Sequence, residues 1–292
     1  MFAVTLFVDT VTNSLPNQNH EPTVGLSKFT VTCYKGQHCD EPSQSLSFQR
    51  TTRSQGKSMP SESLKANWYI VDALSELGKG VIKSYLRGIK GDVAEFGTMT
   101  GDTASVMASA ISSSESIYSD KLPQMGIESR NLYLFDSFIG LPETTEEADL
   151  RSPIVANGVW APGTCLGISP EELRARCAEH LTNDRIHIFE GWFKDTIPLL
   201  DPKLEFAFIH VDCDLYASTR DVLDGLFSRG QVSEGALIYF DDWDCNASRP
   251  DLGERQAWSE AVEKYSIQFS SHHAYAAVGQ AMIVHGYDGF SR

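Results

Sequence analysis

A regular alternation of apolar runs and amphipathic segments begins near residue 91 and limits the possible folds more than any other feature of the chain. The predicted strands are DVAEFG, NLYLFDS, RIHIFEG, EFAFIHVD and GALIYFDD, and helical segments lie between or after them. Strands that alternate with helices form a parallel sheet with helices on both faces. Two later runs, SSHHAYAAV and GQAMIVHG, predict a hairpin around Gly279. We therefore expect an α/β, doubly wound, Rossmann-like sheet that is mostly parallel and ends in an antiparallel hairpin.

The first 60 residues do not follow this alternation. The runs FAVTLFVDTV and KFTVTCYKG predict two short strands, and residues 37–60 are polar, as in a linker or a mobile arm. We expect N-terminal strands with a polar arm over residues 1–60 and a second domain over residues 61–292. The second domain opens with a helical pattern, in which Gly78 and Gly80 are expected to separate two helices.

Two later helices carry residues that mark their starts. In SPEELRARCAEH, Ser169 is placed to cap the helix, Pro170 lies in its first turn, and Glu172 completes a capping box. In DTASVMASAISS, Asp102 or Thr103 is expected to supply the cap. Both helices are therefore expected to begin at these residues, directly after a turn.

Charge and composition narrow the class of partner. The 292 residues include 24 Lys and Arg and 39 Asp and Glu, which gives a formal charge of −15. An acidic surface repels phosphate backbones, so we expect a small-molecule partner and no nucleic acid. No apolar run approaches the roughly 18 residues that a membrane span needs, so no membrane partner is expected. The six cysteines form no C-x-x-C pair and no zinc spacing, which favours reduced thiols and a cytoplasmic location.

The first βα turn, in VAEFGTMTGDTAS, has the residues of a ligand-binding turn. Glu95 ends a strand, and Gly97 and Gly101 flank the turn that follows. Glycines let a ligand approach the backbone, and a helix N-terminus offers N–H donors. The G-x-x-x-G spacing with an acid before it suits a neutral or cationic nucleoside better than a pyrophosphate. The alternative is an ordinary βα turn, and the missing G-x-G-x-x-G argues against a nicotinamide-dependent oxidoreductase.

Two further strand ends offer contacts for a nucleoside. Asp136 ends the strand in YLFDSFIGLPE, where a carboxylate can accept both hydroxyls of a ribose. In IFEGWFKDTIP, the Gly191-Trp192 pair offers a flat surface for an adenine. The alternatives are a cap or turn role for Asp136 and core packing for the aromatic residues.

Acidic residues follow the next two strands. Asp212 ends one of them, and Asp241 and Asp242 end the other. Neighbouring parallel strands lie about 4.8 Å apart, so these carboxylates can reach one hard cation. Mg²⁺ takes oxygen ligands and would relieve the repulsion among three ionised acids. The alternative is that they are solvated loop acids or helix caps.

Asp214 lies two residues beyond Asp212 and need not bind a metal. One interpretation is that it accepts the proton of a substrate hydroxyl as a general base. The other is that it caps the helix that starts near Ala217. His210 lies within the preceding strand, which favours a core position over a role as a ligand.

Taken together, five segments resemble the macrocin O-methyltransferase family. They are GDVAEFGTMTGDTASV, LYLFDSFIGLPE, IHIFEGWFKDTIP, HVDCDLYASTRDVLDGLF and GALIYFDDW, and they span roughly residues 90–245 in the order of the family. These enzymes depend on S-adenosylmethionine and Mg²⁺ and act largely on sugar hydroxyls of natural products. The family usually has an Arg-Gly pair in its first glycine loop, where this chain has Thr100, Gly101 and Asp102.

The resemblance implies a role for each matching position. The residues that would hold S-adenosylmethionine are Glu95, Gly97, Thr98, Gly101, Asp136, Ser137, Gly191 and Trp192. Asp212, Asp241 and Asp242 would bind Mg²⁺, with Asp212 also counted as catalytic, and Asp214 would be the base. An insert over about residues 143–167, with Trp160, would form part of a lid over the acceptor. Family members are commonly dimers or larger, so a homo-oligomer is expected.

Two alternatives to a Mg²⁺-dependent O-methyltransferase remain open. A methyltransferase of the same fold that works without a metal would tolerate a chelator. A non-catalytic nucleoside-binding protein would not need the cluster of three acids. The sequence leaves the acceptor open among sugars, polyketides, phenols and modified amino acids.

Overall fold

The computed structural model describes residues 4–7, 30–33 and 61–289, with side chains described from residue 71 onward. The chain divides into two units, residues 1–60 and 61–292. In the first unit, β1 (Val4–Phe7) pairs antiparallel with β2 (Thr30–Cys33). Both strands lie within the runs predicted from the sequence, and the predicted linker lies outside the described residues.

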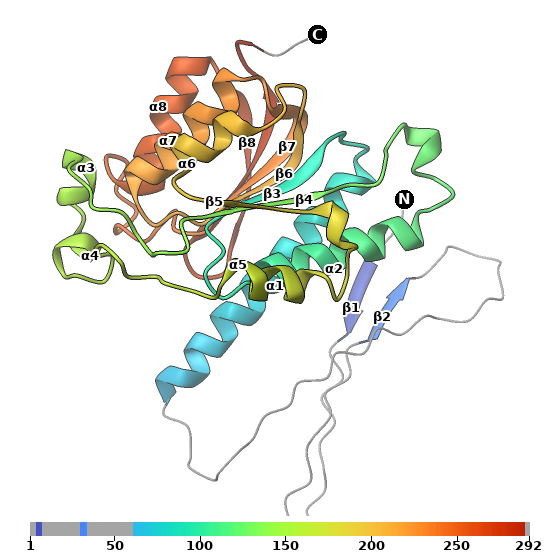
Figure 1. The fold of residues 1–292 in the computed structure, drawn as a ribbon, viewed down its shortest axis with the longest axis horizontal. Coiled ribbons are helices and arrows are strands. Elements are labelled where there is room, and N and C mark those ends of the chain that lie inside the picture. Colours follow the sequence, from blue (N-terminus) through green and yellow to red (C-terminus); the bar gives the residue numbers. More distant parts are fainter. Residues whose placement is uncertain (1–3, 8–29, 34–60, 290–292) are drawn as a thin grey trace, which may run out of the picture. The chain divides into compact units, whose positions relative to one another are not determined.

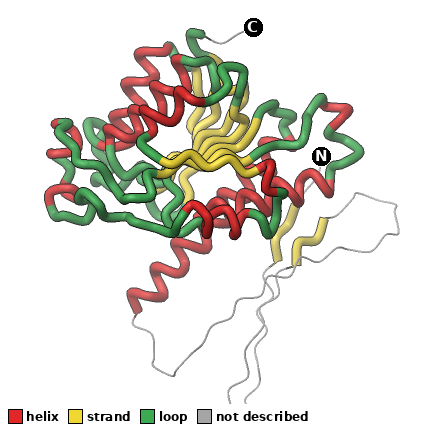
Figure 2. The backbone as a smooth tube through the Cα atoms, viewed as in Figure 1, coloured by secondary structure: helices red, strands yellow, loops and turns green. Residues whose placement is uncertain are grey.

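The second unit contains a seven-stranded sheet in the order β5-β4-β3-β6-β7-β9-β8 (Figure 2). Its strands are β3 (Asp92–Phe96), β4 (Leu132–Asp136), β5 (Ile186–Glu190), β6 (Phe206–Val211), β7 (Val232–Phe240), β8 (Gln268–Tyr275) and β9 (Gly279–Gly286). The first five in this spatial order are parallel, whereas β9 runs antiparallel to β7 and β8 runs antiparallel to β9. The doubly wound sheet with a final hairpin is confirmed.

Helices cover both faces of this sheet (Figure 1). The helices on one face are α1 (Ser61–Leu86), α2 (Asp102–Ile117) and α5 (Pro170–Cys177). The helices on the other are α6 (Phe193–Thr196), α7 (Tyr216–Ser228) and α8 (Gly253–Tyr265). Two short helices of the insert after β4, α3 (Glu147–Leu150) and α4 (Pro153–Ala156), lie to one side of these layers (Figure 1). Among the described residues, no helix has the length and apolarity needed to cross a membrane.

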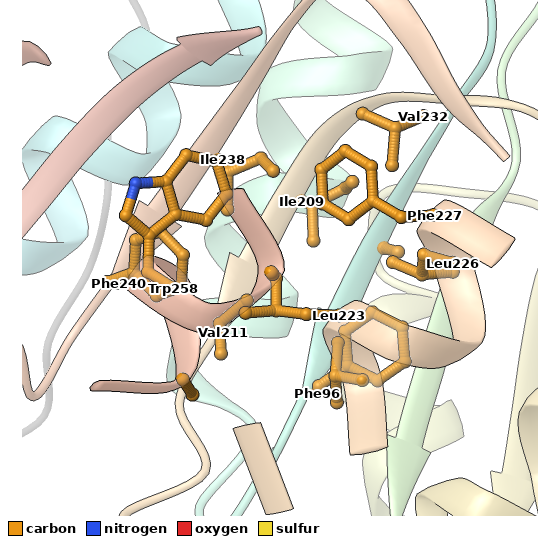
Figure 3. Packing of buried hydrophobic residues seen from close by; sticks show 14 of the residues in the cluster. Phe96, Ile209, Val211, Leu223, Leu226, Phe227, Val232, Ile238, Phe240 and Trp258 are labelled. Carbon is orange, nitrogen blue, oxygen red and sulfur yellow. The ribbon is translucent and has the colours of Figure 1, made fainter. Parts of the chain in front are cut away.

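The central strand β6 is buried along its whole length, as is typical of a parallel sheet covered on two sides. Its successive side chains enter opposite layers, so Phe208 packs beneath α1 and α2 while Ile209 packs beneath α7 and α8. Figure 3 shows the second layer, in which Phe227 of α7 and Trp258 of α8 lie over the sheet. Truncating one of these buried aromatic residues to alanine would cost about 3–5 kcal/mol of folding free energy.

The prediction that two glycines separate α1 into two helices is wrong, because α1 runs unbroken through both. A β-carbon at Gly80 would lie 2.4 Å from the ring of Phe208 and 2.9 Å from that of Tyr239. One at Gly78 would lie 3.3 Å from Val106 of α2. The two glycines therefore allow the helix to pack closely on its neighbours, and this tertiary contact offsets their low helix propensity.

The two predicted helix starts have different outcomes. Ser169 caps α5 as predicted, because its hydroxyl accepts a hydrogen bond from the backbone N–H of Glu172. The predicted side-chain cap of α2 is wrong, since Gly101 occupies the N-cap position in a left-handed conformation and no side chain caps the helix. Leu173 of α5 packs over this turn, 2.8 Å from where a β-carbon of Gly101 would lie. The Asp102 carboxylate instead pairs with Arg176 at 3.0 Å.

Candidate active site

A cavity of about 660 Å³ lies beyond the carboxyl ends of the parallel strands. Loops that follow each of the five parallel strands line it, together with the first turns of α7 and part of the insert. This is the edge at which sheets of this type bind their ligands. Ten of the residues singled out from the sequence line the cavity: Gly97, Thr98, Asp136, Ser137, Gly191, Trp192, Asp212, Asp214, Asp241 and Asp242.

Glu95 and Gly101, the other two predicted cofactor residues, are not among the residues that line this cavity. Gly101 lies beneath α5, as described above. Glu95 is fully buried in β3, and its Oε1 lies 2.9 Å from Nδ1 of His210 on the neighbouring strand. The expected position of His210 in the core is confirmed.

His210 connects the interior of the sheet to the acidic edge of the cavity. Its Nε2 lies 3.9 Å from Oδ1 of Asp241. Burial alone lowers the pKa of His210, but the interactions with Asp241 and Glu95 outweigh it and raise the pKa to about 10. The buried imidazole thus lies between Glu95 and Asp241, and both acids favour its protonated form.

The turn after β3 is built around Gly97 and the Asp136 carboxylate. Gly97 has a φ of +90°, which glycine adopts without the penalty that other residues incur. Asp136 Oδ2 accepts hydrogen bonds from the N–H and the hydroxyl of Thr98, at 2.7 and 3.0 Å, and from the N–H of Met99 at 3.2 Å. Its Oδ1 accepts the N–H of Phe138 at 2.8 Å. A carboxylate has about four lone-pair sites, so a ribose would have to replace one of these donors.

The turn after β5 brings Trp192 to the same side of the cavity. Gly191 has a φ of +135°, and its N–H donates to the Asp136 carbonyl at 2.9 Å, which joins this turn to the end of β4. Trp192 occupies the N-cap position of α6 and is half-buried. The three turns predicted to bind the cofactor thus follow the adjacent strands β3, β4 and β5. Of the residues predicted in them, Glu95 and Gly101 do not line the cavity.

The four aspartates lie at the ends of the adjacent strands β6 and β7, as the sequence pattern predicts. Burial raises the pKa of each of Asp212, Asp214 and Asp242, and repulsion from the neighbouring carboxylates raises it further. For Asp242 the pKa rises to about 6. A cation placed among these side chains would relieve that repulsion.

The fit of these residues to Mg²⁺ is good in chemistry and incomplete in geometry. Carboxylate oxygens are the ligands that Mg²⁺ prefers. However, within the described ranges no three His, Cys, Asp or Glu side chains converge as a ligand set. Both carboxylate oxygens of Asp242 already accept hydrogen bonds, Oδ2 from the N–H of Asp214 at 3.2 Å and Oδ1 from the thiol of Cys245 at 3.1 Å. Metal binding would require side chains of this cluster to turn toward one another.

The structure tests one of the two interpretations of Asp214, that it caps the helix that follows it. Helix α7 begins at Tyr216, with Leu215 at its N-cap position and no cap from that side chain. Asp149 of the insert caps the helix instead, because its carboxylate accepts the N–H groups of Tyr216 and Ala217. Asp214 has a φ of 60° and lines the cavity. The helix-cap interpretation of Asp214 is therefore wrong.

Sequence reasoning missed several residues that line the cavity from the insert and from α7. Thr144, Thr145 and Glu146 do so from the insert, while Arg220 and Asp221 do so from α7. Their positions depend on which segments meet in space, and no local pattern marks them. Trp160, which we expected in the lid, is buried and does not line the cavity.

Solved structures share this fold. The structure titled "Structure of the O-methyltransferase NovP" aligns with a TM-score of 0.56 and 23% identity, over 73% of this chain and 79% of that chain. The calicheamicin methyltransferase CalS11 aligns with a TM-score of 0.52 and 20% identity, over 78% of this chain and 86% of that chain. The fold of residues 61–289 is thus that of a class of Rossmann-like methyltransferases.

Residues 3–259 match the sequence model described as Macrocin-O-methyltransferase (TylF), and the chain belongs to this family. An 8-demethyl-8-(2,3-dimethoxy-alpha-L-rhamnosyl)-tetracenomycin-C 4'-O-methyltransferase of Streptomyces olivaceus is 31% identical over 163 residues, 56% of each chain. A mycinamicin III 3''-O-methyltransferase of Micromonospora griseorubida is 28% identical over 175 residues, 59% of this chain and 63% of the relative. The chain thus matches little more than half the length of these curated relatives.

Proposed function

We propose that this chain transfers a methyl group from S-adenosylmethionine to a hydroxyl of a small molecule, a sugar or another natural-product intermediate, with the help of Mg²⁺. Residues 61–292 form the methyltransferase domain in this proposal. The observation that carries it is one cavity at the carboxyl edge, lined both by the glycine turns of β3 and β5 and by four aspartates of β6 and β7. A methyl donor and an acceptor need such adjoining halves, because catalysis of this transfer depends on holding two reactants in line.

The half of the cavity near β3, β4 and β5 would hold S-adenosylmethionine. Gly97 and Thr98 face it with backbone groups, Asp136 and Ser137 lie toward the ribose, and Trp192 lies toward the adenine. The sulfonium of the donor is a cation, and the excess of carboxylates in the cavity favours it. The longest of the four hydrogen bonds to Asp136, from the Met99 N–H at 3.2 Å, is the one that a ribose hydroxyl would replace most readily.

The acidic half of the cavity would hold the metal and the acceptor hydroxyl. Asp212, Asp241 and Asp242 are the residues that would hold Mg²⁺. When bound, the ion offsets the charge of the carboxylates and lowers the pKa of a nearby hydroxyl. Support comes from the closeness of these carboxylates: burial raises the pKa of Asp212 and of Asp242, and repulsion from Asp241 raises both further.

Asp214 accepts the proton of the acceptor hydroxyl in this proposal. Asp214 lines the cavity, and Asp149 rather than Asp214 caps the helix that follows, so the Asp214 carboxylate is left for the substrate. The acceptor oxygen forms a bond to the methyl carbon while the carbon–sulfur bond breaks. The products are the methyl ether, S-adenosylhomocysteine and the proton now on Asp214.

The acceptor class rests on the walls of the cavity and on the names of the relatives. Thr144, Thr145 and Ser218 offer hydroxyl groups, and Glu146 offers a carboxylate, which suits a ligand with several hydroxyls. The tetracenomycin relative is named for a rhamnosyl substrate. A homo-oligomeric state and a cytoplasmic location also belong to this proposal.

One observation favours a second candidate, a methyltransferase of this fold that needs no metal. The acidic side chains do not converge as a ligand set among the described residues. The test is transfer of labelled methyl from S-adenosylmethionine to a panel of glycosides, with and without EDTA. Turnover that EDTA abolishes and Mg²⁺ restores supports the first candidate, and turnover that EDTA leaves unchanged supports the second. No transfer, together with no binding of S-adenosylhomocysteine, would overturn both.

A further inference from the structure

The start of α7 depends on a residue that lies 67 positions earlier in the chain. A helix begins with N–H groups that have no partner inside the helix. The N-cap residue of α7 is Leu215, whose side chain cannot accept a hydrogen bond. The Tyr216 N–H donates to Asp149 Oδ1 at 2.7 Å, and the Ala217 N–H donates to Asp149 Oδ2 at 3.2 Å.

Asp149 is well placed to hold these two donors. The residue is 2% exposed, and its Oδ2 also accepts the hydroxyl of Thr144 at 2.8 Å. A carboxylate at the N-terminus of a 13-residue helix is stabilised by the helix dipole and by charge-assisted hydrogen bonds. The contact is therefore a specific buried link between the insert and α7, which Figure 1 shows as separate segments.

The link joins two walls of the cavity. On the insert side, Thr144 and Glu146 line the cavity, and on the α7 side so do Asp214 and Arg220. A second contact runs parallel to the first, since the Arg220 guanidinium donates to Glu146 Oε1 at 2.9 Å. The insert is thus fastened to the helix at two points beside the acceptor half of the cavity.

The loop between β6 and α7 needs such support because of its backbone. Asp214 has a φ of 60°, in the left-handed region that L-residues rarely adopt and that aspartate tolerates better than most. Strained positions of this kind persist where the surrounding structure fixes them. Asp214 lies at the wall of the cavity, between the end of β6 and the start of α7, and Asp149 holds that start.

We propose that Asp149 is a positioning residue, which holds the first turn of α7 and thereby fixes the direction in which Asp214 faces the acceptor. The insert then acts as a fixed wall fastened to the catalytic loop rather than as a freely opening lid. The catalytic consequence rests on the function proposed above, whereas the structural consequence does not.

The test is amide hydrogen exchange on Asp149→Asn, with Glu147→Gln as the matched control. Glu147 lies in the same short helix, its side chain is 88% exposed, and its change is chemically the same. Asp149→Asn loses one of two acceptor oxygens, so the amides of residues 216 and 217 should exchange about tenfold faster, with the sheet unchanged. The affinity of Asp149→Asn for S-adenosylhomocysteine should stay within about threefold of that of the unmodified protein. With any acceptor that is found, the fall in kcat should be larger than the change in KM for S-adenosylmethionine.

A general loss of stability would raise exchange throughout the sheet, so the local change separates positioning from folding. If Asp149→Asn does not fold, Thr144→Val takes its place, because it removes a single hydroxyl that donates to Asp149 and keeps the shape. Faster exchange confined to residues 212–217 supports the proposal. Exchange there equal to that of Glu147→Gln overturns it, even if S-adenosylhomocysteine binds and the proposed function holds. If the unmodified protein does not bind S-adenosylhomocysteine, the proposed function is wrong. The hydrogen-exchange result then still shows whether Asp149 holds the start of α7.

Discussion

Gly97 lies so close to Asp212 that a β-carbon at residue 97 would stand 1.8 Å from the Asp212 carbonyl oxygen. The Asp212 N–H in turn donates to the carbonyl of Phe96 at 2.9 Å. The first turn of the proposed cofactor half and the first acid of the proposed metal half therefore share one backbone contact. Any residue that widens this contact should disturb both halves of the cavity.

Replacing Gly97 with alanine tests this contact. Gly158→Ala is the control, because Gly158 also has a positive φ, of +76°, but nothing lies within 4 Å of its β-carbon position. Gly158→Ala should cost about 1 kcal/mol of unfolding free energy from backbone strain alone. Gly97→Ala should cost about 3 kcal/mol or more and weaken binding of S-adenosylhomocysteine at least about tenfold. Urea unfolding and calorimetry measure the two effects, and equal costs at the two sites would contradict the close contact.

The acidic cluster predicts a specific response to Mg²⁺. Repulsion among the carboxylates should fall when the ion binds, so Mg²⁺ should raise the Tm of the EDTA-treated protein. Asp212→Asn should lose most of this rise and all methyl transfer, but keep its affinity for S-adenosylhomocysteine. Asp251→Asn, which changes an acid outside the cavity that pairs with Arg249 and Arg151, is the control and should respond as the unmodified protein does. An equal rise of Tm in Asp212→Asn would show that the ion acts elsewhere.

The cap of α7 gives a pH dependence with a definite sign. Burial raises the pKa of Asp149, and the hydrogen bonds from Thr144, Ala217 and Tyr216 only partly oppose it. The folded protein thus binds this proton more tightly than the unfolded chain, whose aspartate pKa is about 4. The stability that Asp149 contributes is complete below that value and falls as the pH rises through the raised pKa. The difference in unfolding free energy between the unmodified protein and Asp149→Asn should therefore shrink as the pH rises above about 4. A difference that grows with pH would contradict this account.

Gly80 offers a test in which helix propensity and packing predict opposite results. Propensity alone predicts that alanine in the middle of a helix adds about 1 kcal/mol of stability. The rings of Phe208 and Tyr239 leave no room for a β-carbon, so we expect Gly80→Ala to lose about 1–3 kcal/mol instead. Gly286→Ala, at a glycine that also has no positive φ and has nothing within 4 Å of its β-carbon position, controls for the removal of a glycine. A more stable Gly80→Ala protein would contradict the close packing of α1 on the sheet.

The strands and the edge at which they end were predictable because hydrophobic periodicity is a property of local runs, whereas the order of the strands in the sheet is not. Apolar runs bounded by glycines and acids gave each parallel strand, and the carboxyl edge of such a sheet is common to all of them. Asp212 and Asp242 could therefore be placed near one another before their strands were known to be neighbours. Gly80 was misjudged because its use depends on rings of β6 and β7, which lie far along the chain.

The role of Asp149 could not be predicted for the same reason. Nothing near residue 149 marks it as a cap, since the helix that it caps begins 67 residues later. The one local signal is the apolar Leu215 at a helix start, which shows that a cap is missing but not where it comes from. The hydrogen bond from the Thr98 N–H to the Asp136 carboxylate likewise forms only because the loops after β3 and β4 meet in space.

The most direct test of the proposed methyl transfer is calorimetric titration of the metal-stripped protein with S-adenosylhomocysteine. Our account predicts binding near one site per chain with a Kd in the micromolar range, about −8 kcal/mol. Gly97→Ala should weaken that binding, and Asp212→Asn should leave it nearly unchanged. No heat and no thermal shift, in protein shown to be folded, would contradict the account and leave the cavity to another ligand.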